Sequence, residues 1–293
     1  NSIDYKKIIK WLIGAKKKGL KGVGYVGNGE PLAYKQFSNL IKKVNKLGLD
    51  QGVFTNGYLI NRFEDELLSS FTYIRISLDA GSKEIHSSLH DVSSSHFDKI
   101  VKNLKSLLIK RKNKNPTVGV QFATHQRNIF DLEKCVKISK DIGVDYVSVK
   151  PVFDRGSVHE KIEKNSLNAQ KVSKIIDKLR KYESNSFKIF FREHQFESEN
   201  LGYNILDYDR CYAGYFGVNI YEDGVITGCG PHHIPVGDLD TSFDVLEKNI
   251  VKVSKNLDLS KCPAGCRFHP MNRLLHKLKN KDVYSKKEHI NLI

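Results

Sequence analysis

Short apolar runs alternate with longer amphipathic segments through the first 190 residues of the chain. Runs that are apolar on both faces or at every second position predict strands, and apolar positions three and four residues apart predict helices. The predicted strands are 22–26, 52–54, 73–79, 118–123, 146–150 and 187–191. The predicted helices are 8–18, 37–47, 63–69, 96–112, 129–142 and 168–182. Strands and helices that alternate over short connections predict a parallel sheet with right-handed crossovers.

The pattern changes after about residue 200. Two β-like runs, 216–221 and 225–227, flank the turn sequence Glu-Asp-Gly and predict a hairpin. A helix is expected at 243–255, and a basic helix at 271–279 follows a loop with two cysteines. The sequence therefore predicts two domains, residues 1–200 and residues 201–293.

Polar residues gather where the predicted parallel strands end. Because ligands of parallel α/β folds bind at the carboxyl ends of the strands, these side chains define a candidate site. They are Asn28, Glu30, Thr55, Asn56, Ser77, Asp79, Thr124, His125, Asn128 and Lys150.

Charge and composition narrow the classes of protein. The chain carries 48 Lys and Arg against 33 Asp and Glu, a net charge of +15. Its lysines are spread over helix-like segments as on solvated faces, and no nucleic-acid-binding motif accompanies them, so an anionic substrate or cofactor explains the charge at least as well. No apolar run has the length of a membrane helix, and the first residues lack a signal-peptide core.

Four of the five cysteines lie in the second predicted domain, at Cys211, Cys229, Cys262 and Cys266. Four thiolates suit an iron–sulfur cluster or a tetrahedral zinc ion, and unligated thiols are the third interpretation. For zinc, His232, His233 or His269 could replace a thiolate, although a pocket lining or a surface position is the better interpretation of these histidines. Cys135 falls among apolar residues of a predicted helix and is interpreted as a buried, inert thiol.

Three motifs resemble those of radical S-adenosylmethionine (radical SAM) enzymes of the SPASM/twitch group. Residues 25–32, YVGNGEPL, resemble the glycine-rich acidic motif of that family, and residues 76–80, ISLDA, with the following EIH resemble its fourth-strand segment. Cys211 is followed after twelve residues by Gly224, and Cys229 comes after four more, which resembles the opening of a SPASM/twitch module. Phe-Thr-Asn-Gly at 54–57 also fits the end of the family's third strand.

The resemblance implies an α/β fold: a partial (β/α)6 parallel barrel followed by a small α+β twitch-like cysteine module. It implies S-adenosylmethionine as cofactor, one auxiliary [4Fe–4S] cluster on Cys211, Cys229, Cys262 and Cys266, and a second [4Fe–4S] cluster that generates the radical. His90 stands where many relatives carry an Arg toward the methionine carboxylate. The residues assigned to S-adenosylmethionine are Gly27, Asn28, Gly29, Glu30, Thr55, Asn56, Ser77, Asp79, His90 and Asn128.

One departure from the family concerns the cysteines that hold the radical-generating cluster. The family's Cys-x3-Cys-x2-Cys precedes the second strand, but this sequence has no cysteine before Cys135 and begins with Asn rather than Met. We therefore expect the sequence to start downstream of that motif, with the first barrel strand also missing. A relative that has lost catalysis, acting as a metal-binding scaffold or a nucleic-acid-binding protein, is the alternative.

The expected activity is hydrogen abstraction from a substrate by a 5′-deoxyadenosyl radical, ending in an oxidation or in another modification. Lys150 and Arg155, at and after the end of strand 146–150, are nominated as catalytic residues that bind an anionic group or deprotonate a radical intermediate; a loop cap is the alternative role of Arg155. The expected partners are a peptide or a small anionic substrate, together with an electron donor such as flavodoxin or ferredoxin. Thiols and oxygen-sensitive clusters favour the cytoplasm.

Overall fold

The computed structural model describes residues 3–27, 29–152, 167–193, 195–196, 206–262 and 266–279. The chain divides into two compact units between Phe196 and Glu197. Arg155 and Asn28, both predicted site residues, lie outside the described residues.

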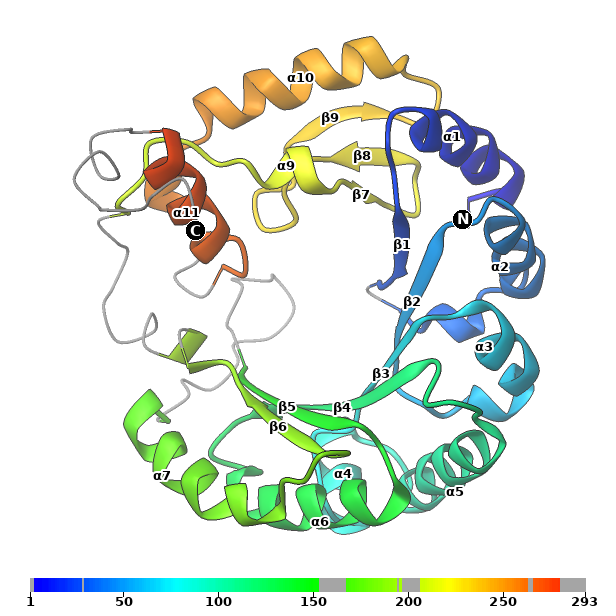
Figure 1. Cartoon of the computed structure of the whole chain (residues 1–293), viewed down its shortest axis with the longest axis vertical. Coiled ribbons are helices and arrows are strands. Elements are labelled where there is room, and N and C mark those ends of the chain that lie inside the picture. Colours follow the sequence, from blue (N-terminus) through cyan, green and yellow to red (C-terminus); the bar gives the residue numbers. More distant parts are fainter. Residues whose placement is uncertain are drawn as a thin grey trace. The chain divides into compact units, whose positions relative to one another are not determined.

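The first unit contains the predicted parallel sheet, with six strands in the order in which they occur in the chain (Figure 1). Every neighbouring pair is parallel. This arrangement confirms the predicted α/β fold with six parallel strands. The strands are β1 (Gly22–Tyr25), β2 (Asp50–Thr55), β3 (Tyr73–Ser77), β4 (Thr117–Thr124), β5 (Tyr146–Pro151) and β6 (Lys188–Phe191).

Helices follow the strands and cover one face of the sheet, the outer face in Figure 1. Their ends are set by local capping: the Asp4 side chain accepts a hydrogen bond from the Lys6 amide at 3.0 Å, and Gly143 ends its helix in the left-handed region at φ 92°. The helices are α1 (Tyr5–Lys17), α2 (Phe37–Lys46), α3 (Glu64–Ser70), α4 (Lys83–His90), α5 (Ser95–Lys110), α6 (Leu132–Ile142) and α7 (Ala169–Leu179).

The core of this unit lies between the sheet and its helices. Alternate residues of the strands, such as Val53, Ile74 and Ile76, are fully buried against helix residues such as Ile41 and Leu104. Because successive side chains of a strand point to opposite faces, the residues between them point to the face without helices. That helix-free face is the one that carries polar and aromatic side chains, including Arg75 and Ser77 of β3.

The second unit contains a three-stranded antiparallel sheet, β7 (Asn219–Ile220), β8 (Val225–Thr227) and β9 (Pro235–Asp238). The predicted hairpin is present, with Gly224 at φ 88° in its turn. Helices accompany this sheet: α9 (Ala213–Phe216), α10 (Phe243–Asn256) and α11 (His269–Lys279). Strand β9 and the short helix α9 were not predicted from the sequence.

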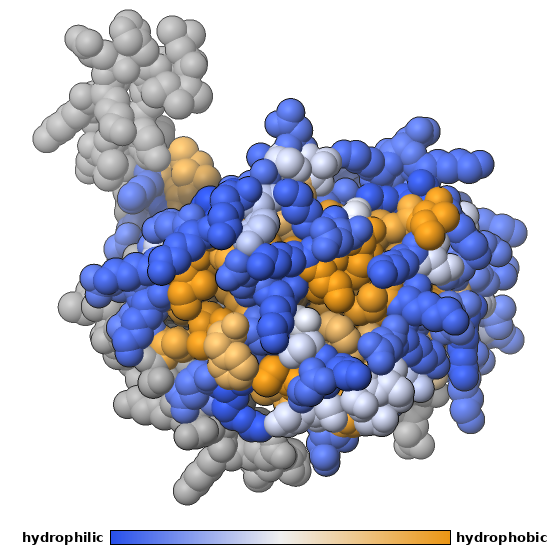
Figure 2. All heavy atoms as spheres, turned by 90° about the horizontal axis from the view of Figure 1, so that it is seen from below, coloured by the Kyte–Doolittle hydropathy of each residue, from blue (hydrophilic) through white to orange (hydrophobic). Residues whose placement is uncertain are grey.

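Lysine side chains lie in solvent, as the spread of charge predicts. All six lysines of α1 and its C-terminal end, from Lys6 to Lys18, are exposed. Figure 2 shows one face of the molecule on which hydrophilic side chains dominate and hydrophobic ones lie between them. Among the described residues, no helix combines the length and the apolar character that crossing a membrane requires.

Candidate functional site

The Glu30 carboxylate is held in place at the carboxyl ends of β1 and β2. Its Oε1 accepts hydrogen bonds from the Thr55 hydroxyl at 2.6 Å and the Leu32 amide at 3.1 Å. Its Oε2 accepts one from the Asn56 amide at 2.8 Å. Glu30 after β1 is therefore in direct contact with Thr55 and Asn56 at the end of β2, as residues predicted from two strand ends. A half-exposed carboxylate with three fixed donors keeps lone pairs free for an ammonium group.

The loop before Glu30 presents uncovered backbone. Gly27 and Gly29 are both exposed, and a Cβ at Gly27 would meet no atom closer than 3.7 Å, while one at Gly29 would meet nothing within 4 Å. Glycine is therefore not required here by crowding. Its lack of a side chain leaves the backbone of Gly27 and Gly29 uncovered, and the predicted contact of these glycines with a ligand stays a prediction.

The end of β3 carries Asp79 in a strained backbone conformation. Asp79 has φ 55°, and its Oδ1 accepts a hydrogen bond from the Ala123 amide at 2.7 Å. Burial raises the pKa of the Asp79 carboxyl, while the Ala123 amide, His90 and Lys150 act to lower it. His90, the last residue of α4, brings its Nε2 to 3.9 Å from Asp79 Oδ2. The structure thus places Asp79 and His90 together and puts the Lys150 charge near them.

The Asn128 side chain supports this site by hydrogen bonds to backbone groups. Its amide nitrogen donates to the Asp79 carbonyl and the Ala123 carbonyl, both at 2.9 Å, and its oxygen accepts from the His125 amide at 2.7 Å. Asn128 is only 1% exposed. Because its polar groups are committed to the chain, it positions the ends of β3 and β4, and a direct contact with a ligand stays a prediction.

Ser77 and Lys150 lie on the helix-free face at the ends of β3 and β5. Ser77 is in register with Gln121 and, through it, with Ser148, whereas Lys150 is in register with Ala123. Lys150 therefore lies one pleat closer to the carboxyl edge of the sheet than the row of Ser77. In the described part of the chain the Ser77 hydroxyl makes no hydrogen bond. A ligand hydroxyl placed over β3 can therefore pair with it.

Two residues that the sequence analysis did not single out also shape this region. Asp131, fully buried before α6, accepts hydrogen bonds at Oδ2 from the Gly81 amide at 2.7 Å and the Ser82 hydroxyl at 2.9 Å, which fixes the loop after β3. Arg75 extends over the helix-free face, with its Cζ 4.2 Å from the centre of the Phe54 ring. The alternation Tyr-Ile-Arg-Ile-Ser in β3 was the available signal for Arg75.

The four cysteines of the second unit are free thiols, and each sulfur lies near a hydrogen-bond donor. Asn272 Nδ2 donates to Cys211 Sγ at 3.4 Å, and His232 Nε2 lies 3.3 Å from Cys262 Sγ. Backbone amides serve the other two: that of His232 for Cys229, and those of Phe268 and His269 for Cys266.

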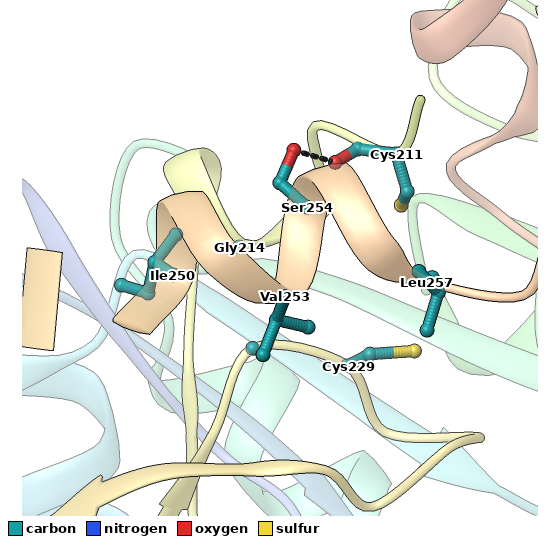
Figure 3. A pocket seen from close by; sticks show the side chains of 8 residues that line it. Cys211, Gly214, Cys229, Ile250, Val253, Ser254 and Leu257 are labelled. Atoms are coloured by element: carbon teal, nitrogen blue, oxygen red, sulfur yellow. Dashed lines mark hydrogen bonds between the residues drawn. The ribbon is translucent and has the colours of Figure 1, made fainter. Parts of the chain in front are cut away.

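The thiols also influence one another. Burial, helped by the charges of Cys266, Cys211 and Cys229, raises the pKa of Cys262 to about 12. Within the described residues, however, no three His, Cys, Asp or Glu side chains are arranged to hold a metal ion. Cys211 and Cys229 line a hollow of about 10 Å³, the space of one water molecule, against Ile250, Val253 and Leu257 of the α10 region (Figure 3).

Hydrogen-bond donors to sulfur stabilise thiolates and tune iron–sulfur clusters, so the donor set fits the predicted auxiliary cluster in its chemistry.

Cys135, the fifth cysteine, lies in the first unit, whereas these four lie in the second. It is fully buried in α6, and burial raises its pKa far above the ordinary value of a thiol. The prediction that this thiol is buried is confirmed.

Solved structures with the same fold are radical SAM enzymes, which confirms the predicted resemblance at the level of the fold. SuiB from Streptococcus suis superimposes with a TM-score of 0.63 at 18% identity, over 88% of this chain and 60% of SuiB. SuiB has also been solved bound to S-adenosylmethionine, with a TM-score of 0.64 to this chain, and bound to the precursor peptide SuiA. A radical SAM methyltransferase from Sphaerobacter thermophilus has a TM-score of 0.50 at 12% identity, over 64% of this chain and 58% of the enzyme.

A curated relative is also found by sequence. It is a tungsten-containing aldehyde ferredoxin oxidoreductase cofactor-modifying protein from Pyrococcus furiosus, 26% identical over 156 residues. The match covers 50% of this chain and 42% of that protein. The chain thus matches less than half the length of its curated relative and about 60% of SuiB. No model of a known protein family matches the chain.

Proposed function

We propose that this chain binds S-adenosylmethionine at the carboxyl ends of β1 to β4 and is the catalytic part of a radical SAM enzyme. The observation that carries the proposal is the Glu30 carboxylate, which Thr55 and Asn56 hold beside the uncovered backbone of Gly27 and Gly29. A fixed carboxylate next to free carbonyls is the arrangement that receives an ammonium group, such as that of the methionine part of the cofactor.

The remaining side chains have roles that follow from their positions. Ser77 offers its hydroxyl to the ribose. Asp79, whose Oδ1 accepts a hydrogen bond from the Ala123 amide, follows Ser77 by two residues after the end of β3. His90, whose Nε2 lies 3.9 Å from Asp79 Oδ2, would bind the methionine carboxylate of the cofactor. S-adenosylmethionine and a [4Fe–4S] cluster, when bound, supply the radical that removes hydrogen from the substrate, while the protein orients the reactants and excludes water.

The substrate class that the comparisons favour is a peptide. SuiB, which shares the fold over most of this chain, was solved with the precursor peptide SuiA. The charge of +15 suits an acidic peptide. We propose a peptide-modifying reaction in which Lys150, on the helix-free face, binds an anionic group or deprotonates a radical intermediate. Arg155 keeps the same proposed role by its place after β5 in the sequence.

We further propose that Cys211, Cys229, Cys262 and Cys266 hold one auxiliary [4Fe–4S] cluster. The support is the donor set: each sulfur lies near an N–H group, and none forms a disulfide. An electron donor such as flavodoxin or ferredoxin is the expected partner of both clusters.

The test is binding of S-adenosylhomocysteine, the demethylated form of the cofactor, by isothermal titration calorimetry. Glu30→Gln is expected to weaken binding about tenfold or more, because a charge-assisted hydrogen bond to the ammonium becomes a neutral one. Glu66→Gln is the matched control, since Glu66 also accepts a hydroxyl, that of Ser38 at 3.3 Å, but lies on α3 at the outer face. Equal affinity of Glu30→Gln and the native chain would refute the proposed site.

A further inference from the structure

A row of four residues crosses the helix-free face one pleat before Ser77. Phe54 of β2 is in register with Arg75 of β3, Arg75 with Gly119 of β4, and Gly119 with Tyr146 of β5. Residues in register on a parallel sheet point to the same face, so Arg75 projects between an aromatic ring and a glycine. The row lies about 7 Å from the row of Ser77 along the strands.

Aromatic rings form a continuous wall along this row. The ring of Phe54 lies 5.7 Å from that of Tyr73, Tyr73 lies 6.3 Å from Tyr146, and Tyr146 lies 5.3 Å from Phe190. The hydroxyls of Tyr73 and Tyr146 hydrogen-bond to each other. The wall is open to solvent at one end, where Phe190 is 48% exposed.

The cation on this wall has no counter-ion among the residues that the structure describes. The Arg75 Nε is buried without a hydrogen-bond partner, and among the described residues no carboxylate pairs with its guanidinium. Asp50, the first residue of β2, lies four residues from the row, about 13 Å along the strand, and Asp79 lies beyond the end of β3. The guanidinium stacks on the Phe54 ring, with its Cζ 4.2 Å from the ring centre.

A partly buried arginine without a partner is costly, and a ligand that supplies a carboxylate removes that cost. The guanidinium fork matches a carboxylate, and rings on both sides suit an apolar group next to it. We propose that Arg75 and the ring wall of Phe54, Tyr73, Tyr146 and Phe190 form a subsite for a carboxylate of the substrate. The subsite rests on the proposed function, because its carboxylate is assigned to an acidic side chain of a peptide substrate.

Two pairs of probes test the subsite in saturation-transfer NMR titrations of the full chain. The first pair is acetyl-Phe-Glu-amide and its neutral match, acetyl-Phe-Gln-amide. The second is phenylacetate, which stands for the carboxylate of a small molecule, and its neutral match, phenylacetamide. The native chain is expected to bind the Glu peptide about tenfold more tightly than the Gln peptide. Arg75→Gln removes this preference, and Arg62→Gln, an exposed arginine near α3, keeps it.

The outcomes separate the possible sources. A preference for phenylacetate over phenylacetamide without one between the peptides assigns the carboxylate to a small molecule. Equal binding within both pairs, no binding of either acidic probe, or an unchanged preference in Arg75→Gln would overturn the subsite. Arg75→Lys, which keeps the charge, and circular dichroism of each variant show whether a loss comes from misfolding.

S-adenosylhomocysteine binding separates this inference from the proposed function. Arg75→Gln is expected to keep the native affinity for S-adenosylhomocysteine, because the Glu30 site lies at the strand ends. Retained cofactor binding with no carboxylate preference refutes the subsite alone. A carboxylate preference in a chain that does not bind S-adenosylhomocysteine refutes the proposed function alone.

Discussion

Tyr146 lies directly over Gly119 on the helix-free face of the sheet. A Cβ built at Gly119 would be 2.1 Å from Cζ of the Tyr146 ring. The two residues are in register on β4 and β5, so the ring leans across the neighbouring strand into the space that the glycine leaves. This relationship sets the position of the Tyr146 hydroxyl against Tyr73, and with it the ring wall beside Arg75.

Gly119→Ala is therefore expected to destabilise the protein by about 1–3 kcal/mol, because the Tyr146 ring has to move out of a packed position. Urea unfolding measures the change. Gly52→Ala is the matched control in the same sheet: its added Cβ would lie 3.6 Å from the Tyr73 ring, an ordinary contact, and alanine is the better residue within a strand. Equal effects of the two substitutions would show that Tyr146 does not depend on Gly119.

The Thr55 hydroxyl, at the end of the neighbouring strand β2, orients the Glu30 carboxylate. It donates to Glu30 Oε1 at 2.6 Å and accepts from the Gly57 amide at 3.0 Å. Thr55→Val removes both bonds and is expected to destabilise the chain by about 1–3 kcal/mol and to weaken S-adenosylhomocysteine binding several-fold. Thr55→Ser keeps the hydroxyl and serves as the control in the same calorimetric titration. A Val variant that binds as tightly as the Ser variant would contradict this role.

His86 makes the stability of the first unit depend on pH. Burial, helped by the charges of His90 and His96, lowers the pKa of His86 from 6.5 to about 4. Because the unfolded chain binds the proton more tightly than the folded one, stability is greatest above pH 6.5 and falls as the pH drops toward 4. The loss attributable to this group is about 3 kcal/mol.

Urea unfolding at pH 7 and pH 4.5 measures this dependence. His86→Phe is the informative variant, since the buried Nδ1 has no hydrogen-bond partner to lose and Phe97 already packs against the ring. The variant is expected to lose less stability between the two pH values than the native chain. An identical loss would assign the acid sensitivity to other groups.

The cysteines of the second unit are predicted to hold iron when the protein is reconstituted anaerobically with iron and sulfide. Cys211→Ala is expected to lower the iron content and the visible absorbance of the cluster, because the substitution removes one of four thiolate ligands. Cys135→Ala is the control, because that thiol is buried in α6 of the other unit. Iron and sulfide contents that are unchanged in Cys211→Ala, or zinc in place of iron, would refute the cluster.

Much of the fold follows from local pattern. The six strands and most of the helices lie within a few residues of their predicted positions, because the alternation between period-two and period-3.6 segments is strong. Helices α4 and α9 and strand β9, with 8, 4 and 4 residues, were missed. The contact of Glu30 with Thr55 and Asn56 could also be anticipated, because parallel strands bring their carboxyl ends to one edge of a sheet.

By itself, the sequence determined which residues stand at that edge and which strand positions face the helices. Only the tertiary structure decided how those residues are used. In the folded chain, the polar groups of the Asn128 side chain hydrogen-bond the backbone. The pairing of the strands places Phe54, Arg75, Gly119 and Tyr146 in one row. The physical reason is register: side-chain alternation follows from local sequence, but which residue of one strand lies beside which residue of the next depends on how the whole sheet pairs and packs.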